Sequence, residues 1–599
     1  MAAKAVNPDK TASHARTYSY PPRVWYFIAS FIALLSLYHF TNMFWSWMRS
    51  KNSAGSSSAS RGVRSLRRIP VAVLNIVRSS IFRTTLFFGG SYKLNIAELF
   101  LSCAYIALLF TWAFINTTNL EGVQLSPQYY ANRIGLIAAT QCPLLIALGM
   151  KNNILTLLTG ISFEKLNILH RISARVLCVM LWIHGAGHVR GSLPPLLSGR
   201  AGNLAELQET WFRCGILAIS SLTLLCILSL QPLRSRAYEA FLVAHFIFGV
   251  IFLGAGYYHA DNDGLGYYLW PSLLVWGLDR FLRLVRIFFV NGGALTLFNT
   301  KSSHSLRAKI EVISPEFLRV SLRRPDYFRW APGQLAYLSI PSVSATPWQA
   351  HPFTIASIDG DIPRAIESES PSRDESFKDK KLVFLLRVHD GFTKRLLNAA
   401  TSTNGANKTF GAYIDGPYCS PPSVRGFETV LSFCGGSGIS FGLPLLLDLI
   451  RGANMGTNPA CRKVILVWAV RHSEQTKAIS NDLLRALDGV SESFTVEIRI
   501  HVTASLDTES DAEQSDGSIN ASDAKLLDAP GVRILAGRPD VAALVKSEVA
   551  AASGSISVNV CGTVGLAESV RSALRAASSA TDILEGGPSI SLHVEAFGI

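Results

Sequence analysis

Four histidines stand in two hydrophobic segments at the same spacing. His170 and His184 are fourteen residues apart in "ILHRISARVLCVMLWIHG", and His245 and His259 are fourteen apart in "AHFIFGVIFLGAGYYHAD". Fourteen residues are close to four α-helical turns, so the members of each pair share one helix face and lie about 21 Å apart along the axis. Polar residues inside apolar spans are costly and usually functional. The repeat therefore predicts a shared task for the four imidazoles.

Imidazoles on two neighbouring helices can bind the iron of one haem from both sides. If both helices cross the membrane in the same direction, His170 stands level with His245, and His184 with His259. This favours two stacked haem sites. Zinc would more often take histidine clustered with cysteine or carboxylate at one level, and we find no such cluster. His188 competes with His184, but only His184 keeps the interval; the other interpretation of His188 is a histidine outside the bilayer.

A second set of candidate residues lies in the C-terminal half. Short β-like runs separated by turn residues fill residues 300–418, which is typical of an antiparallel barrel. Within it stands "HPFTIAS", residues 351–357. A barrel of this kind can hold a flavin at its mouth, with an aromatic ring against the isoalloxazine and hydroxyl groups near its nitrogens.

A glycine-rich turn follows an apolar strand in "VLSFCGGSGIS", residues 430–440. A strand, a glycine turn and a helix together present backbone N–H groups and a helix N-terminus to a pyrophosphate. The turn is not a strict GxGxxG and is a weak signal alone. The strands "KVILVWAV", "SFTVEIRIHV" and "SISVNVCG", with helical segments between them, predict a parallel α/β sheet.

Two arginines stand at the carboxyl ends of predicted strands, where nucleotides lie in such sheets. Arg471 follows "VILVWAV" and Arg538 follows "VRILAG". If the bound nucleotide is NADPH, its 2′-phosphate, which NADH lacks, favours a guanidinium as its partner. We expect Arg471, and secondarily Arg538, to hold that phosphate. The alternative for either residue is a solvated charge at a strand end.

Seven apolar segments place the histidines in a membrane. About 20 apolar residues are needed to cross a bilayer. Of the 599 residues, 49% are hydrophobic and only 16% are charged, which is unusual for a soluble protein. The seven segments are 23–47, 94–115, 132–150, 166–187, 212–230, 238–259 and 268–290.

The net charge of +14 is concentrated in part in one loop. Residues 49–97 hold nine Lys/Arg and no Asp/Glu, which is typical of a cytoplasmic loop beside membrane spans and argues against nucleic acid as a partner. The loop contains "IPVAVLNIVRSSIF", predicted to form an interfacial helix on anionic lipid. The N-terminus is then expected outside and the C-terminal half in the cytosol. The first span is too long for a cleavable signal.

The histidine spacing, "HPFTIAS", "GGSGIS" and "CGT" together resemble the ferric reductase and NADPH oxidase superfamily, in particular the fungal ferric/cupric-chelate reductases. The resemblance covers residues 95–599. It implies a multi-pass α-helical haem domain followed by a ferredoxin-reductase-like module, with an antiparallel β-barrel for FAD and a parallel α/β sheet for NADPH. The expected domains are 1–93 with the first span and the basic loop, 94–290 with six spans and the haems, 299–418 for FAD and 426–599 for NADPH.

The resemblance also implies roles for matching residues. Phe353 would stack on the flavin, with barrel core as its alternative role, and Phe597 would cover the flavin until the nicotinamide displaces it. The chain departs from the family in "GPYC", residues 416–419, where "GPYG" is common, and in the two residues that follow Phe597. The residues expected at FAD are His351, Pro352, Phe353, Thr354, Arg387, Gly391, Thr393 and Phe597. Those expected at NADPH are Gly435, Gly436, Gly438, Ser440, Cys561, Gly562 and Thr563, besides Arg471 and Arg538.

The implied activity is electron transfer from cytosolic NADPH through FAD and two b-type haems to a ferric or cupric chelate across the membrane, expected to be the plasma membrane. No catalytic residue beyond the cofactor-binding groups is expected. An NADPH oxidase that forms superoxide from O2 is the alternative, because both acceptors would meet the same haem edge. A receptor or transporter with a degenerate reductase tail would show no haem spectrum. Protein partners stay unknown; a ferroxidase and permease of iron uptake are one option.

Overall fold

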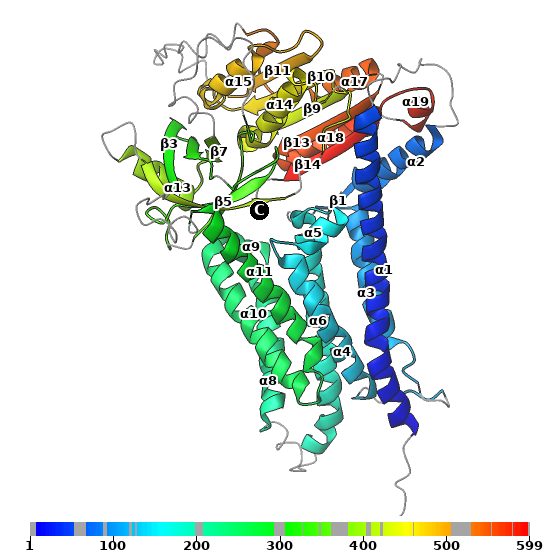
Figure 1. The fold of residues 1–599 in the computed structure, drawn as a ribbon. Helices are drawn as coiled ribbons and strands as arrows, with labels where there is room; N and C mark the ends of the chain where they lie inside the picture. Colours follow the sequence, from blue (N-terminus) through cyan, green and yellow to red (C-terminus); the bar gives the residue numbers. More distant parts are fainter. Residues whose placement is uncertain are drawn as a thin grey trace, which may run out of the picture. The chain divides into compact units, whose positions relative to one another are not determined.

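The computed structural model divides the chain into two compact units, which are described separately (Figure 1). One contains Met1–Asn42 and Ala97–Arg283, and the other Met43–Ile96 and Leu284–Gly598. The residues that the structure describes are 8–52, 68–87, 93–118, 122–125, 128–197, 208–292, 306–325, 327–346, 349–360, 381–402, 409–419, 423–458, 460–504, 529–552, 554–577 and 579–596.

Among these residues, six helices are long and apolar enough to cross a membrane, and they cover the first six predicted spans. The seventh predicted span also forms a helix, α11 (Trp270–Val290), but Asp279, Arg280, Arg283 and Arg286 make it too charged to count among them. The six are α1 (Pro8–Asn52), α3 (Ile96–Phe114), α4 (Gln128–Gly149), α6 (Phe163–Leu197), α8 (Thr210–Leu228) and α10 (Tyr238–Asp261). Short helices α5 (Ile154–Thr159), α9 (Gln231–Arg236) and η4 (Gly266–Tyr268) lie between them.

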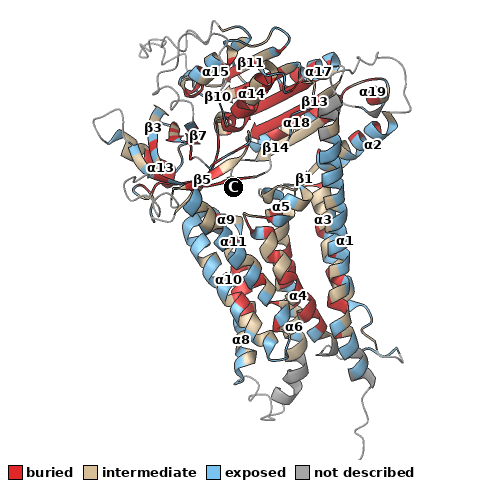
Figure 2. Ribbon diagram, viewed as in Figure 1, coloured by how far each residue is buried: buried red, intermediate tan, exposed pale blue. Residues whose placement is uncertain are grey.

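The helices of this unit keep their buried side chains on the faces that meet one another (Figure 2). Leu109 of α3, Ile134 of α4 and Leu177 of α6 are fully buried, whereas Phe100 of α3 and Trp182 of α6 are exposed. Exposed apolar side chains are expected of helices that face lipid, because hydrocarbon solvates them. Apolar composition therefore places these helices in the membrane. The contacts between helices decide which face of each helix is buried.

A segment between α1 and α3 belongs to the second unit. The fully buried Arg83 fastens it there, since Nη2 donates to the carbonyl of Ile590 at 3.1 Å and the Arg83 carbonyl accepts from Arg575 at 2.6 Å. Burial, and secondarily Arg78, lowers the pKa of Arg83 to about 10, which leaves it charged at neutral pH. The predicted interfacial helix is present here; its contact with lipid stays a prediction. The elements are α2 (Ile69–Val77), π-helix η3 (Arg78–Phe82), β1 (Thr85–Phe87) and β2 (Lys93–Asn95).

Six antiparallel strands form the predicted barrel, in the order β6-β5-β8-β3-β4-β7. A bridge between Ile355 and Phe384 joins the end of β6 to β7 and closes the sheet on itself. Leu318, Leu338 and Phe384 point into its core. The elements are β3 (Leu306–Ser314), β4 (Phe317–Arg323), β5 (Leu335–Ser339), β6 (His351–Thr354), β7 (Lys381–Arg387), α13 (Phe392–Thr401) and β8 (Thr409–Tyr418).

The C-terminal turns of α11 are bonded to this barrel. The Asn291 side chain donates to the carbonyl of Ile414 and accepts from its N–H, both at 2.8 Å. Arg286 forms an ion pair with the buried Asp415 at 2.8 Å. These contacts fix β8 to the helix that precedes the barrel in the chain.

The last part of the chain is a six-stranded parallel sheet in the order β12-β11-β10-β9-β13-β14, as predicted. The chain proceeds from β9 to β12 on one side and then returns to place β13 on the other side of β9. Its strands are β9 (Thr429–Gly435), β10 (Lys463–Val470), β11 (Thr495–Val502), β12 (Val532–Ala536), β13 (Ser555–Gly562) and β14 (Ser589–Ala596). Its helices are η5 (Gly436–Gly438), α14 (Ile439–Asn454), η6 (Ser473–Ala478), α15 (Ser480–Leu487), α17 (Val541–Ala551), α18 (Val564–Ala577) and α19 (Ala580–Leu584).

Candidate functional site

The predicted histidine pairs come together between α6 and α10. The ring centres of His170 and His245 are 6.3 Å apart, and those of His184 and His259 are 6.2 Å apart. Two imidazoles on opposite sides of one metal ion, each bound at about 2 Å, place their ring centres roughly 6 Å apart. Both distances therefore fit an ion held between the two rings.

Three of the four rings direct Nδ1 at a backbone carbonyl of a neighbouring helix. A carbonyl only accepts, so Nδ1 carries the proton and Nε2 carries the lone pair that can bind a metal. Metal-binding histidines almost always donate their second N–H in this way. The distances are 2.8 Å from His170 to Leu145, 2.8 Å from His184 to Ala131 and 3.0 Å from His259 to Trp211.

A glycine makes room for each of these three rings. A Cβ on Gly149 would stand 3.0 Å from the His170 ring, and one on Gly135 or Gly215 would stand 2.7 Å from His184 or His259. Each glycine follows the accepting carbonyl by four residues, so glycine and carbonyl together form one cradle. Sequence analysis missed these residues, although Gly135 and Gly149 repeat the fourteen-residue interval.

The donor set fits two bis-histidine haems. Among the described residues, no group of three or more His, Cys, Asp or Glu could hold a metal ion. A bare ion would need such further ligands, whereas a haem iron needs only the two axial imidazoles.

His188 lies beside the second pair without joining it. Its ring centre is 4.9 Å from that of His184, and its Nε2 bonds the side-chain oxygen of Asn132 at 2.7 Å. The nitrogen that would bind iron is therefore engaged by an amide. This arrangement favours His184 as the ligand.

The "HPFT" residues form an aromatic face on the barrel. His351 stacks on Phe392 with ring centres 4.6 Å apart, and Phe353 lies 6.4 Å from the same ring. Phe353 packs against the barrel core and stays partly exposed, so both of its predicted roles fit. Pro352 is exposed on an edge strand, where its missing N–H costs nothing. Thr354 is almost fully buried.

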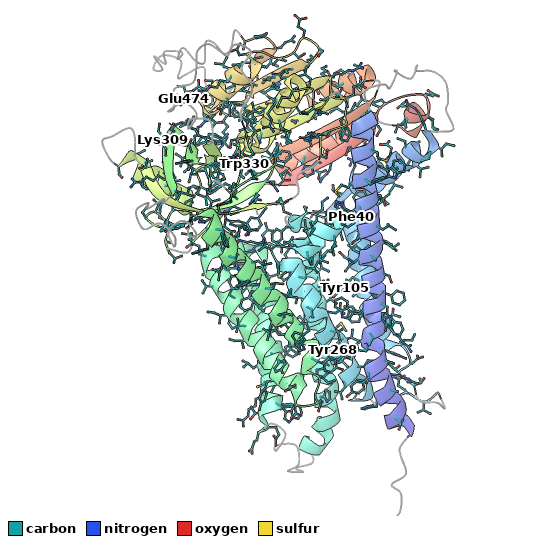
Figure 3. The ribbon with its side chains drawn as sticks, in the orientation of Figure 1. Phe40, Tyr105, Tyr268, Lys309, Trp330 and Glu474 are labelled. Atoms are coloured by element: carbon teal, nitrogen blue, oxygen red, sulfur yellow. The ribbon has the colours of Figure 1, made fainter. Side chains whose placement is uncertain are left out.

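One contact holds the strand that carries these residues. The indole N–H of Trp330, labelled in Figure 3, donates to the carbonyl of Ser357 at 2.7 Å. Ser357 closes the "HPFTIAS" motif, so the motif is fixed at its C-terminal end.

The second predicted FAD-phosphate contact lies at the start of α13. Arg387 ends β7 and is exposed, and Gly391 precedes the helix with a φ of 92°, which glycine adopts readily. The Thr393 hydroxyl accepts from the His389 N–H and donates to the His389 carbonyl, both at 2.8 Å. Thr393 therefore orders the turn at the start of a helix, and a helix N-terminus is a favourable place for an anion.

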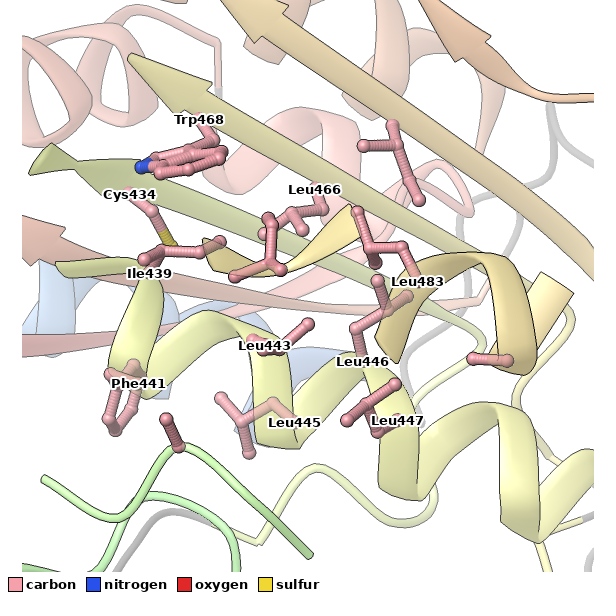
Figure 4. Packing of buried hydrophobic residues seen from close by; sticks show 14 of the residues in the cluster. Cys434, Ile439, Phe441, Leu443, Leu445, Leu446, Leu447, Leu466, Trp468 and Leu483 are labelled. Atoms are coloured by element: carbon pink, nitrogen blue, oxygen red, sulfur yellow. The ribbon is translucent and has the colours of Figure 1, made fainter. Parts of the chain in front are cut away.

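The glycine turn after β9 is tightly packed. Gly436 has a φ of 53°, and a Cβ on Gly438 would overlap the carbonyl of Cys561. The indole N–H of Trp468 donates to the Gly436 carbonyl at 2.8 Å, and the Ser440 hydroxyl donates to Ser437 at 2.9 Å. Figure 4 shows Trp468 above the helix that follows the turn. These bonds fix the turn before any nucleotide binds.

The glycine turn and the "CGT" motif meet at the point where the strand order reverses. Cys434 of β9 pairs with Cys561 of β13, and Cys561 pairs with Glu595 of β14. Gly435 and Gly562 approach so closely that a Cβ on Gly562 would stand 3.0 Å from the Gly435 nitrogen. Thr563 accepts from the N–H of Leu566 at 3.4 Å. Ligands of open α/β sheets bind at such reversal points.

Three family models match the chain, in the order of the membrane helices, the barrel and the parallel sheet. The ferric reductase like transmembrane component matches residues 134–256, the FAD-binding domain 302–422 and the ferric reductase NAD binding domain 427–575. The chain thus resembles ferric reductases in its membrane component, its FAD-binding domain and its NAD-binding domain. It is an integral membrane protein with FAD- and NAD(P)-binding domains.

Three ferric reductase relatives illustrate the likeness. A probable cell surface ferric reductase of Aspergillus oryzae is 31% identical over 57% of this chain and 44% of the relative. A probable ferric reductase transmembrane component of Candida albicans is 23% identical over 83% of this chain and 73% of the relative. Ferric reductase transmembrane component 3 of Saccharomyces cerevisiae is 25% identical over 74% and 58%, so the chain spans about half to three quarters of these relatives.

The two predicted phosphate-binding arginines lie at unequal distances from the glycine turn. Arg471 follows β10, which pairs directly with β9, and Arg538 follows β12, three strands away. At about 4.8 Å per strand, Arg538 begins roughly 14 Å from β9. Arg471 is mostly exposed, and its Nη1 lies 3.6 Å from Glu316. The geometry favours Arg471 over Arg538.

Two further expectations concern Phe597 and Cys419. Phe597, the predicted lid on the flavin, lies outside the described residues. Cys419, the residue at which the chain departs from the expected "GPYG", adopts a left-handed φ of 70°. The Gln334 side chain donates to its carbonyl at 2.8 Å and holds this turn.

Replacing Arg471 by alanine should raise the KM for NADPH by about tenfold. A charged hydrogen bond is worth about 1.5–3 kcal/mol, and Glu316 already screens this guanidinium. The KM for NADH should change little, because NADH has no 2′-phosphate. Glu316→Gln is the matched control and should keep or lower the KM for NADPH. An equal loss with both nucleotides would show that Arg471 supports the fold or the shared pyrophosphate instead.

Proposed function

We propose that the chain is a transmembrane oxidoreductase that passes electrons from cytosolic NADPH, by way of FAD and two b-type haems, to a ferric or cupric chelate on the other side of the membrane. The observation that carries the proposal is the pair of facing imidazoles at each of two levels, 6.3 and 6.2 Å apart. The basic loop favours an orientation with the N-terminus outside. The plasma membrane is proposed because one relative is a probable cell surface ferric reductase.

The membrane unit provides the ligands and the spacing. A haem iron held by two imidazoles exchanges one electron at a time without binding substrate at the metal. His170 and His245 would hold one group, and His184 and His259 the other. Gly135, Gly149 and Gly215 leave space for the rings, and the carbonyls opposite Nδ1 fix the tautomer that leaves Nε2 able to coordinate.

The second unit provides the entry of electrons. FAD accepts a hydride, which is two electrons, and can release them singly. His351, Phe353 and Thr354 would orient the flavin ring, and the start of α13 with Arg387 would bind its phosphate. Gly435, Gly436, Gly438 and Ser440 would receive the NADPH pyrophosphate. Cys561, Gly562 and Thr563 would line the nicotinamide. Burial raises the pKa of the Cys434 thiol beside the glycine turn to about 12, so the thiol stays protonated at neutral pH.

The test uses the purified full chain in lipid nanodiscs. A reduced-minus-oxidised spectrum should show b-type haem after addition of NADPH. Initial rates with ferric chelate, cupric chelate and O2 should then be compared. A faster rate with ferric or cupric chelate supports the proposal. A rate far higher with O2 would identify an NADPH oxidase, and the absence of a haem spectrum would remove the redox proposal.

A further inference from the structure

The fourteen-residue interval occurs on α6 and α10, which carry the histidines, and also on the two helices that pack against them, α4 and α8. On α4, Gly135 faces His184 and Gly149 faces His170. A step of fourteen residues forward along α4 thus matches a step of fourteen back along α6, as antiparallel helices require. In both cradles the carbonyl four residues before the glycine bonds the Nδ1 of the ring.

The same step on α8 leads from a glycine to a serine. Gly215 faces His259, and three residues further along α8 Ala218 faces Gly256 at 3.9 Å, so the antiparallel register with α10 continues. Fourteen residues from Gly215 is Ser229, and fourteen back from His259 is His245. Ser229 keeps helical angles, with a φ of −78° and a ψ of −4°, directly after the end of α8. It therefore stands at the cradle position of His245.

The repeat predicts a backbone carbonyl as the hydrogen-bond partner of His245, and Ser229 already donates to that carbonyl. By the pattern of the other three cradles, that carbonyl belongs to Leu225. Ser229 donates to it twice, from its hydroxyl at 2.6 Å and from its backbone N–H at 3.1 Å. A carbonyl oxygen has two lone pairs, so both are taken. The Nδ1 of His245 is buried. Because the carbonyl is taken, this nitrogen has no hydrogen-bond partner among the described residues.

We propose that Ser229 is a positioning residue that makes the ligands of one haem unequal. Opposite His245, the hydroxyl of Ser229 withholds the Leu225 carbonyl, whereas His170 on the other side donates to Leu145. At the second level both rings donate to carbonyls. The inference rests on the proposed function, because it concerns residues that would hold a haem.

The asymmetry has a defined electronic consequence. Donation of the Nδ1–H to a carbonyl makes an imidazole a stronger donor to its metal, and a stronger donor favours ferric over ferrous iron. Hydrogen bonding of this kind is one of the means by which proteins set haem potentials. A haem bound by His170 and His245 should therefore be easier to reduce than it would be with a complete cradle.

The test is a potentiometric titration of haem absorbance in the full chain in nanodiscs. Ser229→Gly removes the hydroxyl and frees the Leu225 carbonyl for His245. One of the two midpoint potentials should fall by the equivalent of about a tenfold change in the ferric-to-ferrous ratio, which is about 59 mV for a one-electron couple. The other midpoint should not move. Ser229→Ala, which keeps the Cβ, should shift the same midpoint in the same direction by less.

Two controls assign the effect. Ser102→Gly removes the same kind of hydroxyl-to-carbonyl bond, 2.6 Å long, from α3, and should move neither midpoint. Adding His184→Ala to Ser229→Gly should leave only the shifted haem. If wild type shows two haems and both serine variants leave the midpoints unchanged, raise one or move both equally, this inference is wrong while the proposed function stands. If wild type shows no haem, the proposed function itself fails.

Discussion

Replacing His170 or His245 by alanine should remove one of two b-type haems and abolish electron transfer across the membrane. The two rings face each other at 6.3 Å, so neither alone can provide both axial ligands. Replacing His184 or His259 should remove the other haem. Haem content per protein, measured by pyridine haemochrome, should fall by half in each single variant, and transmembrane reduction of a ferric chelate should fall to background.

His188→Ala is the matched control for this series. It deletes a histidine four residues from His184, whose Nε2 bonds Asn132. Both haems should remain. A variant of His188 that loses a haem, together with a variant of His184 that retains two, would exchange their roles and contradict the pairing.

Gly215→Val should remove the second haem without touching a ligand. A Cβ at this position would already stand 2.7 Å from the His259 ring, and valine adds two methyl groups in the middle of a helix. Overpacking of a tight site costs about 1–3 kcal/mol, which corresponds to about a 5- to 150-fold loss of haem affinity. The haem difference spectrum and the haem-to-protein ratio would measure it.

Gly254→Val is the control that distinguishes loss of the cradle from a general effect of valine on a membrane helix. Gly254 lies on α10, is exposed and has no atom within 4 Å of its built Cβ. The substitution makes the same change in helix propensity as Gly215→Val and should keep both haems. If Gly254→Val loses haem as Gly215→Val does, the loss reports weakened helices and the cradle has no special role.

The histidine pairs could be predicted from helical periodicity alone. His170 and His184 share a helix face because fourteen residues nearly complete four turns, and this property of a single helix is readable from sequence. The barrel and the parallel sheet were predictable for the same reason, since alternation and strand–turn–helix order are local patterns. The "HPFT" and glycine motifs could be assigned only by resemblance, and their roles stay proposals.

Other features depend on contacts between distant segments. Gly215 contacts a ring 44 residues away in the chain, and nothing in the local sequence distinguishes it from Gly254. α11 forms the helix of the seventh predicted span but carries Asp279, whose carboxylate pairs with Arg280 and accepts from the distant Asn152 side chain at 2.9 Å. Arg83 reads as one more basic loop residue until the fold buries it against Ile590.

The sequence by itself determined which residues share a face: two histidines on each of two helices, and the ends of parallel strands on one sheet edge. It did so because helix rise and strand alternation are fixed by the backbone. Only the tertiary structure decided which carbonyl each imidazole meets. That choice depends on the register between α8 and α10, in which Ser229 takes both lone pairs of Leu225 and leaves His245 without the partner that the other three histidines have.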